Sequence, residues 1–329
     1  MKRKILYCVI LFIVFFSHET FPQRGLYRDI NTTNAKIYHI KGKVKEIKQD
    51  VFSADTINGK IVQVKRIENN YSEIYNDKGN IIEKKIYKWG SGLYRTCSFK
   101  YNEAGRIIEE NEFYAGGNGD NKVIYIYNEK GQLIEENHVS TNTGRHNNYI
   151  FHFDEKGNMI LVNECSFIAS KDFIDTLSLE FYNCSYDEKG KLIERCHYNS
   201  SGNLIQKDLW CFNEAGNQTL YCAFNNDSIL YYKSICSNPD NGIIKRWESY
   251  SYNSDGTMHS IKKSNYDENF NIISENIFYS NEKWSGQKEP GNYIYKYEFD
   301  NQGNWIEKTE FLDEFPIRIT IREIKYYVE

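Results

Sequence analysis

The chain has 329 residues, a formal net charge of -4 and an aromatic fraction of 16%, and these numbers exclude several classes of protein. Its length suffices to bury a sizeable core as one large or two ordinary domains, and its wealth of Tyr, Phe and Ile excludes intrinsic disorder. Lys and Arg total 41 against 45 Asp and Glu, so we expect no nucleic-acid partner. The aromatic bias, led by 27 Tyr and 19 Phe, favours strands over helices.

Residues 1–22 have the pattern of a secretory signal peptide. A basic start, Lys2 to Lys4, precedes an unbroken apolar run from Ile5 to Phe16. The run is shorter than the roughly 20 residues of a comfortable membrane span, and no later run approaches that length. We therefore expect an exported protein with no membrane span beyond the signal segment, located in the periplasm, on the outer-membrane surface or outside the cell. An uncleaved anchor is the alternative, because Ser17 is the only small residue directly after the run.

Residues 23–60 are predicted to form an N-terminal β cap. Residues 43–47 alternate apolar and charged residues, and Asn58-Gly59 is a strong hairpin turn signal. The chain from Arg318 to Val328 alternates in the same way and is expected to cover the other edge of the sheet. Capping matters because an open edge strand invites aggregation.

Residues 61–329 are predicted to form one repeat domain. A short motif, Tyr-Asn-x-x-Gly-x-Ile/Leu-Ile-Glu, recurs with a period of 26 residues in the first half of this region. Ten units are recognisable, one of them with Phe270 in place of glycine. The turn glycines of the other nine are Gly79, Gly105, Gly131, Gly157, Gly190, Gly202, Gly216, Gly256 and Gly303.

Each unit is predicted to be a β-hairpin. Asn or Asp suits the first position of a type I turn, and Gly suits the left-handed position that closes the turn as a G1 bulge. A period of 26 residues accommodates two strands and a second, looser hairpin. The sequence thus predicts an all-β fold in which antiparallel hairpins form a long twisted or coiled open sheet, with helix only in the N-terminal signal.

Alternation assigns the side chains to two faces of this sheet. Residues one and three before the turn Asn or Asp share a face and are often aromatic, as in Tyr125 and Tyr127. Cysteines occupy equivalent strand positions, so we interpret them as packing residues. Seven lie outside the signal, an odd number that cannot pair completely: Cys97, Cys165, Cys184, Cys196, Cys211, Cys222 and Cys236.

The repeat resembles the YD repeat of bacterial RHS-type proteins. The string from Tyr125 to Glu135 is close to that family's Tyr-Asp-x-x-Gly-Arg-Leu core, although only Gly105-Arg106 keeps the Gly-Arg pair. The similarity extends over about residues 70–310. It is stronger still to short, exported, repeat-only bacterial proteins of unknown function with a Gly-Asn-Trp copy near the C-terminus, here Gly303 to Trp305. The resemblance implies a β scaffold, often proposed to bind carbohydrate, and supplies no catalytic residues.

No constellation of residues predicts catalysis, a metal or a cofactor. There is no Cys-x-x-Cys pair, no zinc-like Cys/His spacing and no Gly-x-Ser-x-Gly elbow. Adjacent acids such as Glu109-Glu110 point to opposite faces of a strand, which does not suit a glycosidase pair. We therefore expect a protein that is not an enzyme.

The predicted function is a scaffold that presents a binding surface to a glycan or an envelope protein. Trp89 and Trp284 are the candidate binding residues, because they lie beside Gly-rich loops where an aromatic ring can be exposed. The alternative is a component or relic of an RHS-like toxin or secretion system. Three triplets resemble the acceptor pattern of periplasmic O-glycosylation in some bacteria: Asp55-Thr56-Ile57, Asp175-Thr176-Leu177 and Asp227-Ser228-Ile229.

Overall fold

A computed structural model describes residues 40–67, 70–88, 92–117, 119–169, 174–237, 245–280 and 288–328. These residues form an all-β structure of twenty-one strands. Within the same ranges, no helix is long and apolar enough to cross a membrane. The expected signal peptide, residues 1–22, lies outside the described residues.

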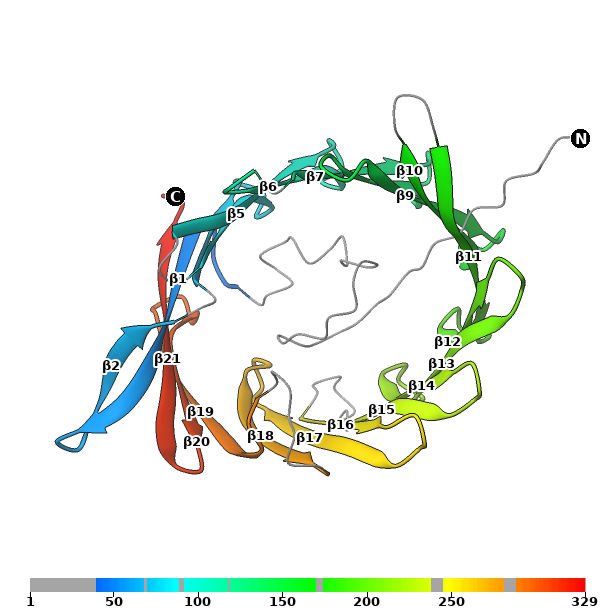
Figure 1. Ribbon diagram of the computed structural model, residues 1–329. Coiled ribbons are helices and arrows are strands. Elements are labelled where there is room, and N and C mark those ends of the chain that lie inside the picture. Colours follow the sequence, from blue (N-terminus) through cyan, green and yellow to red (C-terminus); the bar gives the residue numbers. More distant parts are fainter. Residues whose placement is uncertain are drawn as a thin grey trace, which may run out of the picture.

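The strands follow one another as antiparallel hairpins (Figure 1). The first half of the chain contains β1 (Val44–Ile57), β2 (Lys60–Arg66), β3 (Asn70–Tyr75), β4 (Ile81–Lys88), β5 (Gly92–Tyr101), β6 (Ile107–Tyr114), β7 (Asn121–Tyr127), β8 (Leu133–Ser140), β9 (Arg145–Phe153), β10 (Met159–Ala169) and β11 (Ile174–Tyr186). The second half contains β12 (Leu192–Asn199), β13 (Leu204–Phe212), β14 (Gln218–Asn225), β15 (Leu230–Ser237), β16 (Arg246–Tyr252), β17 (Met258–Tyr266), β18 (Ile272–Tyr279), β19 (Gly291–Phe299), β20 (Trp305–Leu312) and β21 (Phe315–Tyr326).

The sheet closes on itself, so the prediction of an open twisted sheet is wrong. Strand β1 pairs with β3 on one side and with β21 on the other, from Val44 opposite Tyr326 to Ser53 opposite Arg318. The two terminal segments that were expected to cover separate edges therefore cover each other. All strands except β2 belong to this closed barrel, and β2 pairs with the outer part of β1 to form a hairpin that projects from the wall (Figure 1).

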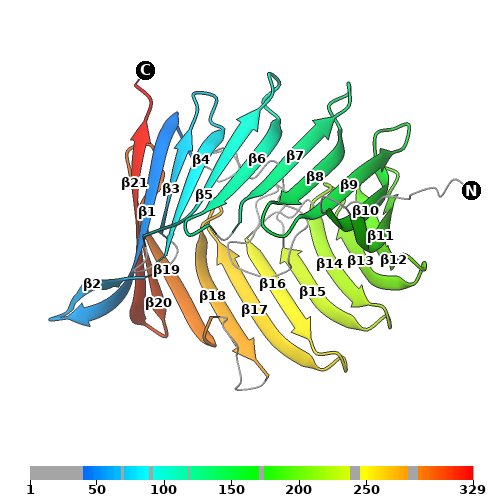
Figure 2. The same cartoon turned by 45° about the horizontal axis from the view of Figure 1, so that its top comes forward.

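The barrel has two unlike rims (Figure 2). The turn rim, at the end where the C-terminus lies, carries the hairpin turns at Gly79, Gly105, Gly131, Gly157, Gly190, Gly216, Phe270 and Gly303. The opposite rim, here called the arm rim, carries the turns at Gly202, Ser228, Gly256 and Asp313-Glu314, together with the projecting hairpin. Because neighbouring strands are antiparallel, alternate hairpin turns necessarily lie at opposite rims.

The hairpin turn of each repeat unit, here called a signature turn, is a type I turn closed by a residue in the left-handed conformation. In the first copy the Gly79 amide donates to the Asn76 carbonyl at 2.9 Å, and the Asn76 side chain accepts the Asn80 amide at 2.9 Å. The nine turn glycines have φ between 75° and 88°, a region that costs L-residues energy. The side chain of Asn or Asp at the first position therefore stabilises the loop that glycine permits.

A β-bulge follows most of these turns and accounts for the two adjacent apolar residues. Tyr75 pairs with Ile81 while Ile74 pairs with Glu83, so Ile82 is the extra residue of the bulge. Ile81 is buried and Ile82 is exposed. The same register shift recurs beside the turns at Gly105, Gly131, Gly190, Gly216, Gly256 and Gly303.

The inner face of the wall is the more buried one. Side chains converge on the concave side of a closed sheet and diverge on the convex side. Val123 and Tyr125 on this face are 9% and 5% exposed, whereas Ile124 and Ile126 on the outer face are 37% and 39% exposed. A continuous hydrophobic cluster runs along the inner face from Val44 and Ile47 to Tyr182 and Cys184.

Candidate functional site

The inner-face aromatics near the turn rim hold successive repeats together. The hydroxyl of Tyr101 donates to the carbonyl of Ile81 at 2.7 Å, and that of Tyr127 donates to Ile107 at 2.8 Å. Tyr186 and Tyr297 make the equivalent bonds to Met159 and Ile272. Each acceptor is the first residue after a turn, next to the bulge. These tyrosines therefore belong to the architecture rather than to a ligand site.

A belt of charged side chains follows the inner face on the arm-rim side of these tyrosines, and on one side of the barrel three of its carboxylates lie near one another. Glu164 of β10 lies directly opposite Glu180 of β11 in the ladder. Two strands away, Glu136 of β8 faces Tyr149 of β9, whose hydroxyl is 3.4 Å from Glu164 Oε1. We call Glu136, Glu164 and Glu180 the acidic arc.

Histidines, rather than Lys or Arg, contact the carboxylates at the two ends of this arc. His138 Nε2 lies 2.5 Å from Glu136 Oε1, and His197 Nε2 lies 2.6 Å from Glu180 Oε2. Burial raises the pKa of Glu164 to about 7, and the neighbouring carboxylate of Glu180 adds to the effect. The arc therefore holds a proton on Glu164 near neutral pH.

The opposite side of the belt pairs its carboxylates with cations. Glu275 of β18 accepts Lys262 at 2.6 Å and Lys288 at 3.1 Å, and these charges hold its pKa down at about 2 despite burial. Glu310 of β20 contacts Lys288 and Arg318, each at 3.3 Å. We call Lys262, Glu275, Lys288, Glu310 and Arg318 the paired arc.

An isolated ion pair, Arg195–Asp208, lies between the two arcs. Both side chains are almost completely buried, with 3% and 1% exposed. Arg195 Nε donates to Asp208 Oδ2 at 2.9 Å, and Tyr221 donates to Oδ1 at 2.8 Å. Burying both charges is tolerated because the carboxylate is hydrogen-bonded on both oxygens.

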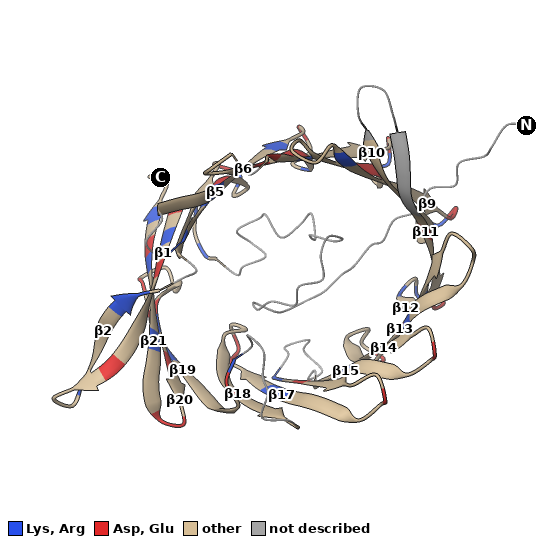
Figure 3. Cartoon of the chain, viewed as in Figure 1, with Lys and Arg blue, Asp and Glu red and all other residues tan. Residues whose placement is uncertain are grey.

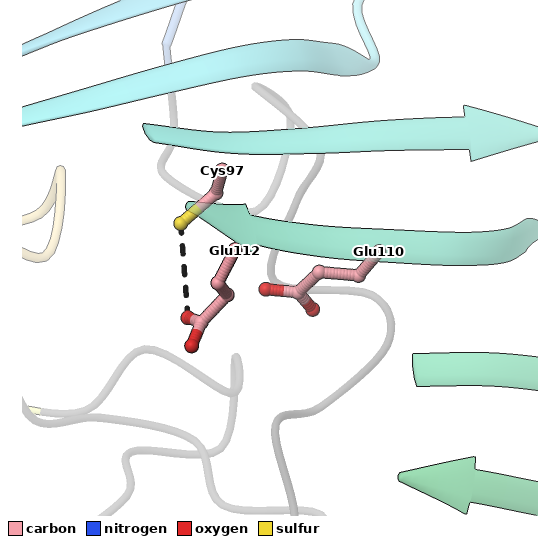
Figure 4. A group of neighbouring side chains, drawn as sticks. All are labelled: Cys97, Glu110 and Glu112. Atoms are coloured by element: carbon pink, nitrogen blue, oxygen red, sulfur yellow. Dashed lines mark hydrogen bonds between the residues drawn. The ribbon is translucent and has the colours of Figure 1, made fainter. Parts of the chain in front are cut away.

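Within the described part of the chain, one group of side chains could hold a metal ion by distance alone. The ligand atoms of Cys97, Glu110 and Glu112 lie within 4.8 Å of one another on β5 and β6 (Figure 4). Cys97 Sγ is 3.7 Å from Glu112 Oε1, the oxygen that also accepts Arg95 Nη1 at 2.7 Å. A cation among these atoms would face the Arg95 guanidinium, so we assign the group to the packing of the inner face.

The outer face mixes charge with exposed apolar side chains. Lys100 and Lys122 bind Glu109 from both neighbouring strands, and Lys207 binds Glu194 at 2.6 Å. Charges of both signs occur around much of the wall (Figure 3). Between them lie isolated apolar groups such as Phe113 and Phe278, which are 47% and 52% exposed.

The projecting hairpin, residues 54–65, exposes three large apolar side chains, and we call it the arm. Ile57, Ile61 and Val64 are 53%, 43% and 60% exposed. Asn58 and Gly59 form its tip with φ of 51° and 73°, which confirms the predicted hairpin turn. A register shift between Ser53 and Ala54 leaves Val64 as a bulge residue. The barrel closes through other contacts, so the arm is not needed for closure.

The predicted binding residues Trp89 and Trp284 lie outside the described residues. Two other tryptophans pack against neighbours: Trp210 is buried beside Tyr221, and Trp305 stacks on the Arg322 guanidinium at 3.5 Å. Cys97, Cys165, Cys184 and Cys236 are buried in the wall.

One turn of the repeat, at Ser228, was not predicted from the sequence. The Ser228 amide donates to the Asn225 carbonyl, and Asn225 Oδ1 accepts the Ile229 amide at 2.9 Å, as in the other turns. The missing glycine hid it. The Asn at the first position and the two apolar residues after the turn, Ile229 and Leu230, were the available signal.

Comparisons with known proteins give distant structural similarity. No protein-family model and no curated protein matches the sequence. Among solved structures, a porin-like protein from Bacteroides uniformis is 11% identical with a TM-score of 0.36, covering 87% of this chain and 99% of that one. A porin-like protein from Bacteroides vulgatus is 10% identical with a TM-score of 0.31, covering 71% and 95%.

The complex TcdB2-TccC3 is also similar, at 10% identity and a TM-score of 0.22, over 82% of this chain and 20% of that one. None of these TM-scores reaches 0.5, so we base the functional proposal on the residues of this chain alone.

Proposed function

We propose that the protein is an exported, non-enzymatic barrel scaffold that binds an envelope protein through the arm. The observation that carries this proposal is the exposure of three large apolar side chains, Ile57, Ile61 and Val64, on a hairpin that the barrel does not need. By contrast, many aromatic side chains and carboxylates of the inner face are buried, and they contact one another or neighbouring cations. The apolar run of residues 5–16 after a basic start supports export.

The chemistry of the arm favours an extended, acidic partner segment. Among the described strands, β2 pairs with β1 alone, so its other edge is available for main-chain pairing. Lys60 and Lys65 on this edge outnumber the one carboxylate of the arm, Asp55. Two β2 edges paired antiparallel about Val62 and Gln63 would bring Lys60 opposite Lys65, and this like-charge contact disfavours a second copy.

The outer face supports an envelope location in water rather than in lipid. A barrel that spans a membrane presents an apolar band about 25 Å tall to the lipid. Here ion pairs such as Lys122–Glu109 and Lys207–Glu194 lie on the outward side of the wall. We place the barrel in the periplasm or on the outer surface of the cell.

Site-specific photo-crosslinking in the envelope tests the proposal. A photoreactive residue replaces Val64 on the arm or, as the matched control, Ile124 on the outer face, and cross-linked products are identified by mass spectrometry. We expect one discrete protein at Val64 that is absent at Ile124 and is lost in the variant Ile57→Ser/Ile61→Ser. Saturable binding to an envelope polysaccharide, unchanged in that variant and without a cross-link at Val64, would overturn the protein-binding role in favour of a glycan.

A further inference from the structure

All three Asp-Ser/Thr-aliphatic triplets of the sequence lie near the arm rim. Thr56 is in the arm, two residues before its tip, and Ser228 is in the β14–β15 turn. Asp175 and Thr176 directly follow Ile174, where β11 begins at the same rim. The triplets are separated by 120 and 52 residues in the chain, so nothing local in the sequence requires them to share one end of the barrel.

The side chains of two of the triplets are accessible. Asp55, Thr56 and Ile57 are all exposed, and so are Asp227 and Ser228. In the arm, the Thr56 amide donates to Asp55 Oδ1 at 2.7 Å, which places the carboxylate beside the acceptor residue. A hydroxyl on a narrow, projecting hairpin can enter the active site of a large enzyme without unfolding of the barrel.

Ser228 has a second unusual feature, its backbone conformation. It has a φ of 60°, at the turn position where nine other signature turns have glycine. A side chain at this position strains the backbone, and Ser228 and Phe270, with a φ of 63°, are the two copies of the repeat turn that retain one. Unlike glycine, serine places an exposed hydroxyl group at this turn.

We propose that Thr56 and Ser228 are acceptor sites for O-linked glycans. The donor class is an oligosaccharide carried on a polyprenyl diphosphate at the periplasmic membrane, so this inference rests on the proposed export. The hydroxyl oxygen forms a bond to the anomeric carbon, and the bond from that carbon to the diphosphate oxygen breaks. The lipid diphosphate leaves with the electron pair, and a base of the transferase takes the hydroxyl proton.

Modification of Thr56 would restrict docking to one face of the arm. Thr56 pairs with Ile61, whereas Ile57 pairs with Lys60, and consecutive strand residues point to opposite faces. A glycan on Thr56 therefore covers the Ile61 face of the hairpin. The Ile57 face and the free edge of β2 remain open to a partner.

The test is the mass of the full-length chain produced in a bacterial host with a periplasmic O-glycosylation system. We expect the peptides that contain Thr56 and Ser228 each to carry one glycan mass, which alkaline β-elimination removes. Thr56→Ala and Ser228→Ala should each lose one glycan, and Asp55→Asn and Asp227→Asn should do the same with the hydroxyl retained. Ser201→Ala, at an exposed turn of the same rim without a preceding Asp, should leave the mass of the glycans unchanged.

The outcomes separate this inference from the proposed function. An N-terminus that shows signal removal, with both acceptor peptides bare, would overturn the glycan sites and leave the exported scaffold intact. Recovery of the chain in the cytoplasmic fraction, with both peptides bare, would overturn both. Modification of Ser201 to the same extent as Ser228 would also overturn the inference, because it would show that the Asp-containing triplet does not select the sites.

Discussion

The two sides of the barrel's inner wall hold buried carboxylates by different means. In the paired arc, Lys262 and Lys288 surround Glu275 and keep it ionised. In the acidic arc, Glu164 faces another carboxylate, Glu180, and retains its proton to about pH 7. The same repeat geometry thus buries acids either with cations or with protons, and the second solution depends on pH.

In both arcs a buried carboxylate is either paired with a cation or protonated. We therefore expect an unpaired buried charge to lower the free energy of unfolding most. The strongest test removes one member of the buried pair between the arcs. Asp208→Ala leaves the Arg195 guanidinium without this carboxylate in a site where only 3% of its side chain is exposed, and we expect a loss of about 3–5 kcal/mol in the free energy of unfolding. Urea denaturation at pH 7 measures the loss.

The matched control is an ion pair on the outer face. Lys207 and Glu194 are each 36% exposed, so Glu194→Ala should cost less than about 1 kcal/mol. Equal costs for Asp208→Ala and Glu194→Ala would contradict the claim that burial sets the difference between the two faces.

The contribution of the acidic arc to the free energy of unfolding should decrease as pH rises. The pKa of Glu164 is raised from an ordinary 4.5 to about 7, so its contribution is fully present below pH 4.5 and is lost as pH rises through 7. At about 1.4 kcal/mol per pH unit, Glu164→Gln should be more stable than the wild type by about 3 kcal/mol at pH 8 and similar to it at pH 4.5. Urea titrations at both pH values measure the difference, and a difference that is the same at both would refute the raised pKa of Glu164.

The paired arc should respond to pH with the opposite sign. The pKa of Glu275 is lowered from 4.5 to about 2, so its contribution is present above pH 4.5 and is lost as pH falls through 2. The full effect is again about 3 kcal/mol, but other carboxylates titrate in the same window. Carbon-13 NMR follows the titration of the Glu275 carboxyl group separately from the others. A titration midpoint near pH 4.5 would show that Lys262 and Lys288 do not lower its pKa.

Much of the wall could be predicted from sequence, because it depends on local chemistry. A turn with Asn first and Gly fourth requires a hairpin, and strand alternation then assigns Tyr125 and Tyr127 to one face. Closure was not predictable in this way. It depends on the pairing of Val44–Ser53 with Arg318–Tyr326, segments that no local pattern connects, and on small curvatures summed over all the strands.

The acidic arc was also hidden from the sequence, for a related reason. Glu164 and Glu180 meet only because the β10–β11 ladder shifts register between Ser166 and Phe167. A shift of one residue reverses the face of every side chain beyond it. The alternation of apolar and polar residues does not predict a bulge that lies away from a recognisable turn. The sequence therefore contains no indication that these two carboxylates face each other.

A smaller effect tests whether the inner-face tyrosines stabilise the barrel through their hydroxyl groups. Tyr127→Phe removes the hydroxyl that donates to the Ile107 carbonyl and should cost about 1 kcal/mol. Phe153 is the natural control, since it occupies the equivalent position without a hydroxyl. Phe153→Leu should disturb packing but no such hydrogen bond. Unfolding at pH 7 measures both, and a neutral Tyr127→Phe would show that the bulge carbonyl does not need this donor.

The smallest effect is expected from glycine substitutions in two turns of the arm rim, measured on protein made without glycosylation. Ser228 has a positive φ, so Ser228→Gly should relieve strain and stabilise the fold by about 0.5 kcal/mol. Ser201 precedes the positive-φ residue Gly202, so Ser201→Gly should lose about the same amount through the greater entropy of the unfolded chain. Opposite signs in thermal or urea unfolding would establish that Ser228 retains its side chain at a cost in stability. If both variants are destabilised, Ser228 is not strained, and the conformational reason for assigning its hydroxyl a role disappears.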